Sequence, residues 1–119
     1  MGIDKWREDA INWIHQASEL PEVSPNQHIA KPSLQARANA LHIIIRHVPT
    51  DFVPVELGIT SNRGIELDWR KGEKELEIEV LPDGSIEVLR CLAGTKINES
   101  KMQRPDWRLG EAFVWLELS

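Results

Sequence analysis

The stretch Gly64–Leu89, "GIELDWRKGEKELEIEVLPDGSIEVL", decides the fold, because aliphatic residues and carboxylates alternate along most of it. Eight Glu or Asp residues lie between Glu66 and Glu87, although glutamate is a poor strand former. Alternation with a period of two is typical of a strand that has one buried face and one solvated face. The stretch therefore predicts strands over about residues 65–70, 74–81 and 85–91, with the carboxylates on one face.

Turn residues set the expected register of these strands. Lys71–Lys74 suits a two-residue turn with glycine first, and Pro82–Gly84 suits a three-residue loop. A further alternating run over residues 53–60 adds a strand, which we expect at the sheet edge because it contains Pro54. We place Gly64 at the bulge position after a type I turn. The expected pairs are Ile59–Leu67, Leu57–Trp69, Trp69–Leu76, Leu67–Ile78, Val80–Ile86 and Ile78–Val88.

Helical periodicity appears on both sides of this region. Residues 3–20 and 32–48 carry apolar residues every three or four positions and stop before a proline. The tail, residues 106–118, fits a helix, although its "FVWLEL" segment also fits a strand; the residues before it read as a polar loop. We place the apolar face of the second helix on Leu34, Ala38, Leu41, Ile45 and Val48, with Ile43 opposite. The apolar face of the tail helix comprises Leu109, Ala112, Phe113 and Leu116.

These elements predict a single α+β domain over residues 1–119. A four-stranded antiparallel meander forms one layer, and two helices, or three if the tail is helical, pack on its apolar face. A chain of 119 residues can form such a core without a disulfide or a metal.

Bulk composition is that of an ordinary globular protein, with 41% hydrophobic and 28% charged residues. Cys91 stands alone, so the sequence offers no internal disulfide, and a single cysteine favours a reducing compartment. No apolar run approaches the length of a membrane span, and residues 1–13 lack the apolar stretch of a signal peptide. We therefore expect a cytoplasmic protein with no membrane partner.

The net charge of −5 is concentrated in the middle of the chain. Residues 51–92 hold ten acids and five bases, whereas residues 1–50 hold five of each and residues 93–119 hold four of each. Nucleic-acid-binding domains normally carry the opposite charge on their working face. We therefore do not expect a nucleic-acid partner.

The expected register sorts the carboxylates of the solvated face into cross-strand rows. The rows are Glu56–Arg70–Glu75, Gly58–Asp68–Glu77–Leu89 and Thr60–Glu66–Glu79–Glu87. Like charges on neighbouring strands are unfavourable, and nothing in folding requires them. We take this face as a candidate partner-binding surface, with Glu66, Asp68, Glu77, Glu79 and Glu87 as the binding residues.

Motifs of enzymes are missing from the sequence. Cys91 has no C-x-x-C partner, and His42 and His47, five residues apart, are expected on different helix faces, so we expect no zinc site and no other cofactor. A metal-dependent nuclease would need an Asp and an E-x-K on neighbouring strands. Asp68 and Glu77–Glu79 have that spacing, but Glu79 replaces the lysine. We expect no catalytic residues.

The helix followed by "GIELDWRKGEKELEIEVLPDGSIEVL" resembles a loosely defined group of small, uncharacterised bacterial proteins. Their shared core is a G-I-x-L-x-W strand, a charged turn, an alternating strand and a P-D-G turn. The resemblance covers about half of the chain and implies a bacterial protein of the same hairpin core; it implies no activity, cofactor or catalytic residue.

Three functions remain open at this point. The first is a non-enzymatic accessory or regulatory subunit, such as an antitoxin-like or defence-complex subunit, that presents its acidic sheet face to a basic protein. The second is a metal-dependent, nuclease-like enzyme that uses the sheet carboxylates. The third is a small structural domain whose acidic face serves only solubility.

Overall fold

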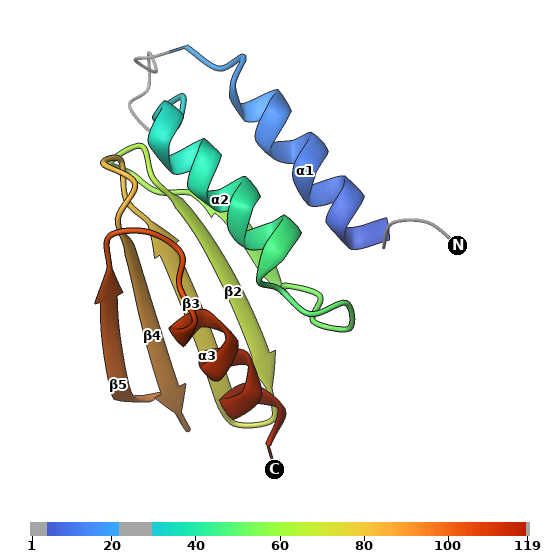
Figure 1. Cartoon of the computed structure of the whole chain (residues 1–119), viewed down its shortest axis with the longest axis vertical. Coiled ribbons are helices and arrows are strands. Elements are labelled where there is room, and N and C mark those ends of the chain that lie inside the picture. Colours follow the sequence, from blue (N-terminus) through green and yellow to red (C-terminus); the bar gives the residue numbers. More distant parts are fainter. Residues whose placement is uncertain (1–4, 22–29, 119) are drawn as a thin grey trace.

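The computed structural model describes residues 5–21 and 30–118, and within these ranges the chain forms three helices and a five-stranded antiparallel sheet. The strand order follows the sequence, β1-β2-β3-β4-β5. Helices α2 and α3 lie on one face of the sheet, and α1 lies against α2 (Figure 1). The fold is therefore α+β, as expected, but with one strand more than the expected four. The elements are α1 Lys5–Ala17, α2 Leu34–Arg46, β1 Glu56–Ile59, β2 Ile65–Lys71, β3 Lys74–Val80, β4 Ile86–Leu92, β5 Thr95–Met102 and α3 Arg108–Glu117.

The aliphatic side of the sheet forms the core. Leu67 and Ile78 are fully buried, and Val88 is 2% exposed, so the predicted common apolar face is confirmed. Trp69 contacts Phe113 of α3 edge-on, with ring centroids 4.9 Å apart, and its indole N–H donates to Phe52 O at 2.9 Å. An aromatic pair of this geometry adds stability beyond its buried area.

The tail is a helix, and α3 buries the four residues expected on its apolar face: Leu109, Ala112, Phe113 and Leu116. Lys74 Nζ donates to the carbonyl oxygens of Trp115 at 2.8 Å and of Leu118. Carbonyls at the end of a helix lack partners within the helix, so a lysine there satisfies them. These contacts fix the end of α3 over the turn between β2 and β3.

Helix α2 presents a different face to the sheet from the one expected. Ala36, Ala40, Ile43 and Ile44 are fully buried, whereas Leu34 is 66% and Ile45 is 51% exposed. The expectation placed Ile43 on the outside and was wrong on this point. The helix is apolar on more than one side, and the small residues Ala36 and Ala40 lie on its buried side. Val48, which was expected on the apolar face, is buried.

Two contacts orient α2 on the loop between β3 and β4. Ser33 caps the helix by accepting from Ala36 N at 3.0 Å, and its hydroxyl donates to Pro82 O at 2.6 Å. Asn39 Nδ2 donates to Gly84 O at 2.6 Å. Helix α1 then packs against α2 through Ala10, Ile14 and Ala17, while residues 3 and 4 of the expected helix lie outside the described residues.

Strand β5 occupies the segment that the sequence predicts as a polar loop. Its side chains are almost all exposed, so it shows no apolar alternation. The turn between β4 and β5 indicates a hairpin, since Ala93 has φ 52° and Gly94 has φ 83°. Two successive positive φ values are typical of a type I′ hairpin turn. None of the described helices is long and apolar enough to cross a membrane.

Candidate functional site: a carboxylate face on the open side of the sheet

The side of the sheet opposite α2 and α3 carries the carboxylates of the alternating strands. We call this side the open face. It is organised in two cross-strand rows: Glu56–Asp68–Glu77–Leu89–Glu99 and Gly58–Glu66–Glu79–Glu87–Lys101. All five predicted binding residues lie on it, and each is half-buried: Glu66, Asp68, Glu77, Glu79 and Glu87.

The predicted register is confirmed between β2, β3 and β4 and wrong between β1 and β2. Leu57 pairs with Leu67 and Ile59 pairs with Ile65, a shift of two residues from the expected pairs. Glu56 therefore lies opposite Asp68, and not in the expected row with Arg70. Glu56 is for this reason absent from the candidate site residues predicted from the sequence.

The turn before β2 explains the shift. Thr60 N donates to Gly64 O and Arg63 N donates to Thr60 O, the same pattern that Leu81 and Ser85 form around Gly84. Arg63, with φ 71°, holds the left-handed position that we expected for Gly64. Gly64 is required for space, because a Cβ there would lie 2.5 Å from Val80 O.

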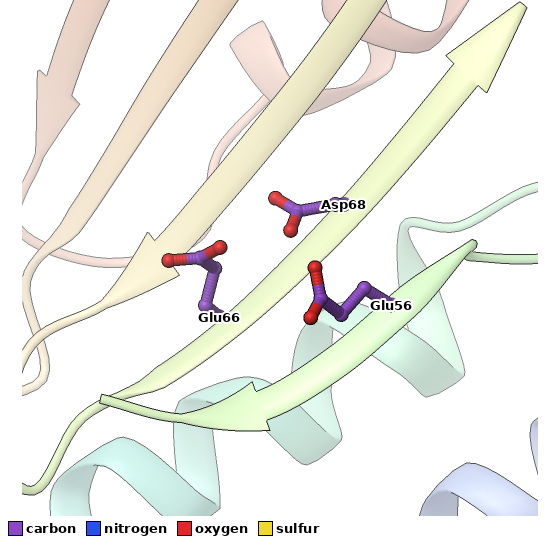
Figure 2. A group of neighbouring side chains, drawn as sticks. All are labelled: Glu56, Glu66 and Asp68. Atoms are coloured by element: carbon purple, nitrogen blue, oxygen red, sulfur yellow. The ribbon is translucent and has the colours of Figure 1, made fainter. Parts of the chain in front are cut away.

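Glu56, Glu66 and Asp68 form the densest part of the open face (Figure 2). One carboxylate oxygen from each lies within 4.8 Å of the others. Glu66 and Asp68 project from β2 two residues apart, and Glu56 reaches toward them from β1 (Figure 2). We call these three residues the carboxyl cluster.

Burial and like charge raise the pKa values around the cluster. The pKa of Glu66 rises to about 7, first because of burial and then through its hydrogen bond and repulsion with Asp68. The pKa of Asp68 rises to about 6, again with burial as the main cause and with repulsion from Glu77 and Glu56. Burial also raises the pKa values of Glu77 and Glu79, and repulsion from neighbouring glutamates adds to it. Every charged neighbour that shifts these four pKa values is itself a carboxyl group.

Basic side chains form ion pairs on the open face beside the cluster. Lys101 Nζ lies 3.4 Å from Glu87 Oε2, at the β5 side. Arg70 lies 3.6 Å from Glu75, next to the turn that joins β2 and β3. These exposed pairs are worth little in stability. They offset charge at Glu87 and Glu75 rather than at the three residues of the cluster.

A shallow hollow of about 190 Å³ adjoins the cluster, lined by Glu56, Glu66, Asp68, Glu77 and Cys91 among others. Carboxylate oxygens in this arrangement can accept hydrogen bonds from lysine or arginine side chains, or ligate a hard divalent cation. Position 79, where a nuclease would need its lysine, is a glutamate directly opposite Glu66.

The cysteine and histidines do not converge. Cys91 lies half-buried on the open face beside Glu75, while His42 and His47 belong to α2 and its C-terminal end, on the other side of the sheet. The expectation that the two histidines point to different helix faces was wrong, because their rings stack with centroids 5.2 Å apart.

Comparisons with protein-family models, with curated proteins and with solved structures found no match for this chain. The resemblance to small bacterial proteins with the same hairpin core therefore stays a prediction.

Proposed function

We propose that this protein is a non-enzymatic interaction subunit whose open face binds a basic surface of another protein. The observation that carries the proposal is the carboxyl cluster, in which the pKa of Glu66 is raised to about 7 with no basic side chain among the charged neighbours that shift it. A lysine or arginine of a partner, placed against Glu56, Glu66 and Asp68, would supply the missing positive charge.

The energetics support a role for this arrangement beyond folding. Like charges that lie directly opposite each other on neighbouring strands are destabilising. Glu66–Glu79, Glu79–Glu87 and Asp68–Glu77 are such pairs, and all face away from the core. A cationic partner converts this repulsion into attraction, so part of the binding free energy is already present as strain in the free protein.

The accessory role can be stated more narrowly. A cytoplasmic regulatory subunit that neutralises a basic protein, as an antitoxin-like or defence-complex subunit would, fits an acidic face without catalytic groups. The separate alternative of a face that serves only solubility predicts no specific partner and is distinguished by the experiment below.

The experiment compares two double variants that remove the same charge from different places. Glu66→Gln with Glu79→Gln removes two carboxyl groups from the open face, whereas Glu8→Gln with Glu111→Gln removes two from exposed positions on α1 and α3. Each tagged protein captures partners from a lysate of its host, and quantitative mass spectrometry compares the captured proteins. We expect a basic protein retained by wild type and by the helix variant, and lost from the open-face variant.

The captured protein is then purified, and its association rate is measured at low and high salt. Surface charges steer encounter and are screened by salt. We expect the open-face variant to associate on the order of tenfold more slowly at low salt, with a difference that shrinks at high salt. Equal capture and equal rates for the two double variants would leave only the solubility role.

Divalent-cation binding is the second candidate, favoured by the convergence of three carboxylate oxygens within 4.8 Å. Calcium, magnesium or manganese would then raise the melting temperature of wild type but not of an Asp68→Asn variant. A nuclease of this kind also needs a lysine that orients the attacking water, and the chain has Glu79 at that position. No melting shift with any of the three metals removes this candidate and leaves the protein-binding proposal untouched.

A further inference from the structure

The outer edge of β5 offers an unused strand-pairing surface. β5, Thr95–Met102, is the terminal strand of the sheet, and its outer side is uncovered in Figure 1. It is eight residues long and contains neither glycine nor proline, whereas β1 at the opposite edge has four residues and follows Pro54 closely. A long, exposed edge strand presents a row of unpaired N–H and C=O groups that can pair with another strand.

The hydrogen bonds at the ends of the β3–β4 ladder identify which groups of β5 point outward. Leu81 N donates to Ser85 O and Ala93 N donates to Glu73 O, at the two ends of the β3–β4 ladder. Because hydrogen-bonded pairs alternate in antiparallel ladders, the odd-numbered residues of β4 bond to β3 and the even-numbered residues bond to β5. Ser100 pairs with Val88 and Asn98 pairs with Arg90, so these two residues of β5 point their backbone groups inward. Glu99, which lies between these two residues, and Lys101, which follows Ser100, therefore point theirs outward; the register shifts on the other side of Asn98, so the alternation applies from Asn98 to Met102.

The charges of β5 complement a second copy of β5 in one register. Two antiparallel copies that hydrogen-bond through these outward residues must place odd-numbered residues opposite odd-numbered residues. Centred on Glu99, the pairing opposes two glutamates, which is unfavourable. When the pairing is centred on Ser100, Glu99 of each copy lies opposite Lys101 of the other copy. The two-fold symmetry therefore gives two pairs of opposite charge. Glu99 already contacts Lys96 and Lys101 contacts Glu87, but a carboxylate and an ammonium group each accommodate more than one partner.

We propose that a second copy of this chain pairs antiparallel to β5 with the two-fold axis between the two Ser100 residues. The axis of such a pair runs perpendicular to the sheet, so the sheets of both copies become continuous and both open faces lie on the same side. The interface between copies is thus separate from the carboxyl cluster, and it would present two acidic faces to a partner at once.

A charge-swap series tests the proposal by sedimentation equilibrium. In the Ser100-centred register, Glu99→Lys opposes lysines and Lys101→Glu opposes glutamates, so each variant should weaken the dimer on the order of tenfold. An equimolar mixture of the two variants restores opposite charges in a heterodimer, and the double variant Glu99→Lys with Lys101→Glu restores them in a homodimer. We expect dimers for wild type, the double variant and the mixture, and circular dichroism verifies that each variant is folded.

Disulfide trapping provides a second, independent measurement of the register. Ser100 would face its own copy in a non-hydrogen-bonded pair, with Cα atoms about 4.5 Å apart, which lies within disulfide range. In a Cys91→Ser background, Ser100→Cys should cross-link on mild oxidation, whereas Asn98→Cys, which would face Met102, should not. Wild-type protein that stays monomeric up to about 1 mM would overturn the proposal, as would a dimer that neither single charge variant weakens. The lysines of β5 would then serve only to protect the edge.

Discussion

Glu66 shows on the scale of a single residue how charge and burial interact on the open face. Its carboxyl group lies between Asp68 on its own strand and Glu79 on the neighbouring strand, partly removed from water. Both effects disfavour the ionised form, so the folded protein holds a proton that the unfolded chain releases. This difference in proton binding links the stability of the fold to pH.

The first prediction is that stability rises as the pH falls from 8 to 5. The pKa of Glu66 is raised from 4.5 to about 7, and that of Asp68 from 3.8 to about 6, so the folded state binds more protons than the unfolded state in this window. The stabilisation is present at low pH and is lost as the pH rises through about 7. Melting temperatures of wild type and Glu66→Gln across this range check it, and the variant should show the weaker dependence.

His47 requires a control in this experiment. Burial lowers its pKa from 6.5, so it acts in the opposite direction and removes stability as the pH falls. The difference between wild type and Glu66→Gln cancels this contribution, because both proteins contain His47. A difference that is the same at pH 5 and pH 8 would contradict the assignment to Glu66.

Gly64 supports a second prediction at this scale. A Cβ at Gly64 would lie 2.5 Å from Val80 O and 2.9 Å from Thr60 Oγ1, and the first of these is backbone. We expect Gly64→Ala to destabilise the protein by about 1–3 kcal/mol, as overpacking does. Gly58→Ala, where nothing lies within 4 Å of the added Cβ, is the matched control and should cost little. Denaturant midpoints measure both, and equal effects would mean that the turn before β2 is not as described.

Among the elements, helix α2 makes the most specific claim about packing. Ile43 is fully buried and Ile45, two residues later, is 51% exposed. We expect Ile43→Ala to cost about 2–5 kcal/mol and Ile45→Ala to cost much less, since only the first leaves a cavity. Urea unfolding of the two variants checks this prediction. A larger effect at Ile45 would mean that α2 buries the face predicted from the sequence and not the face described above.

Elements with strong alternation or a clear apolar stripe could be predicted from the sequence, and elements without either could not. The strands β2, β3 and β4 were correct because their patterns allow one solution. The buried face of α3 was correct for the helical alternative of the tail, although the pattern also fitted a strand. α2 has apolar residues on several sides, so periodicity alone did not select Ile43 over Ile45. Apart from Met102 at its end, β5 has no buried side chains and so no apolar stripe. A strand at the edge of the sheet, beside a face that is not covered, needs no such stripe.

Residues of the candidate site could be predicted from the sequence wherever the predicted pairing of neighbouring strands was correct. Glu66, Asp68, Glu77, Glu79 and Glu87 were placed together because two correct hairpins fix them. Glu56 was not, because Arg63 occupies a backbone conformation that usually favours glycine. Arg63 O accepts from Ser33 N at 3.1 Å and its Nε donates to Lys31 O at 2.8 Å, tertiary contacts that no local pattern reveals.

On the scale of the whole molecule, the described helices lie on one side of the sheet and leave the other side to the carboxylates. The apolar side forms the core, so the acidic side is free to carry charge that folding does not need. We propose that this charge is unfavourable in the free protein and is relieved by a cation from a partner.

Titration of the side-chain carboxyl carbons by NMR in the free protein tests this claim most directly. The account predicts that the carboxyl cluster titrates with apparent pKa values of about 7 and about 6, attributed chiefly to Glu66 and Asp68. Because the groups interact, these values belong to the cluster as a whole. In Glu56→Gln the lower value, attributed to Asp68, should fall, since Glu56 raises the pKa of Asp68 by repulsion and through a hydrogen bond. Carboxyl groups that all titrate below about 5, as ordinary aspartates and glutamates do, would contradict the account.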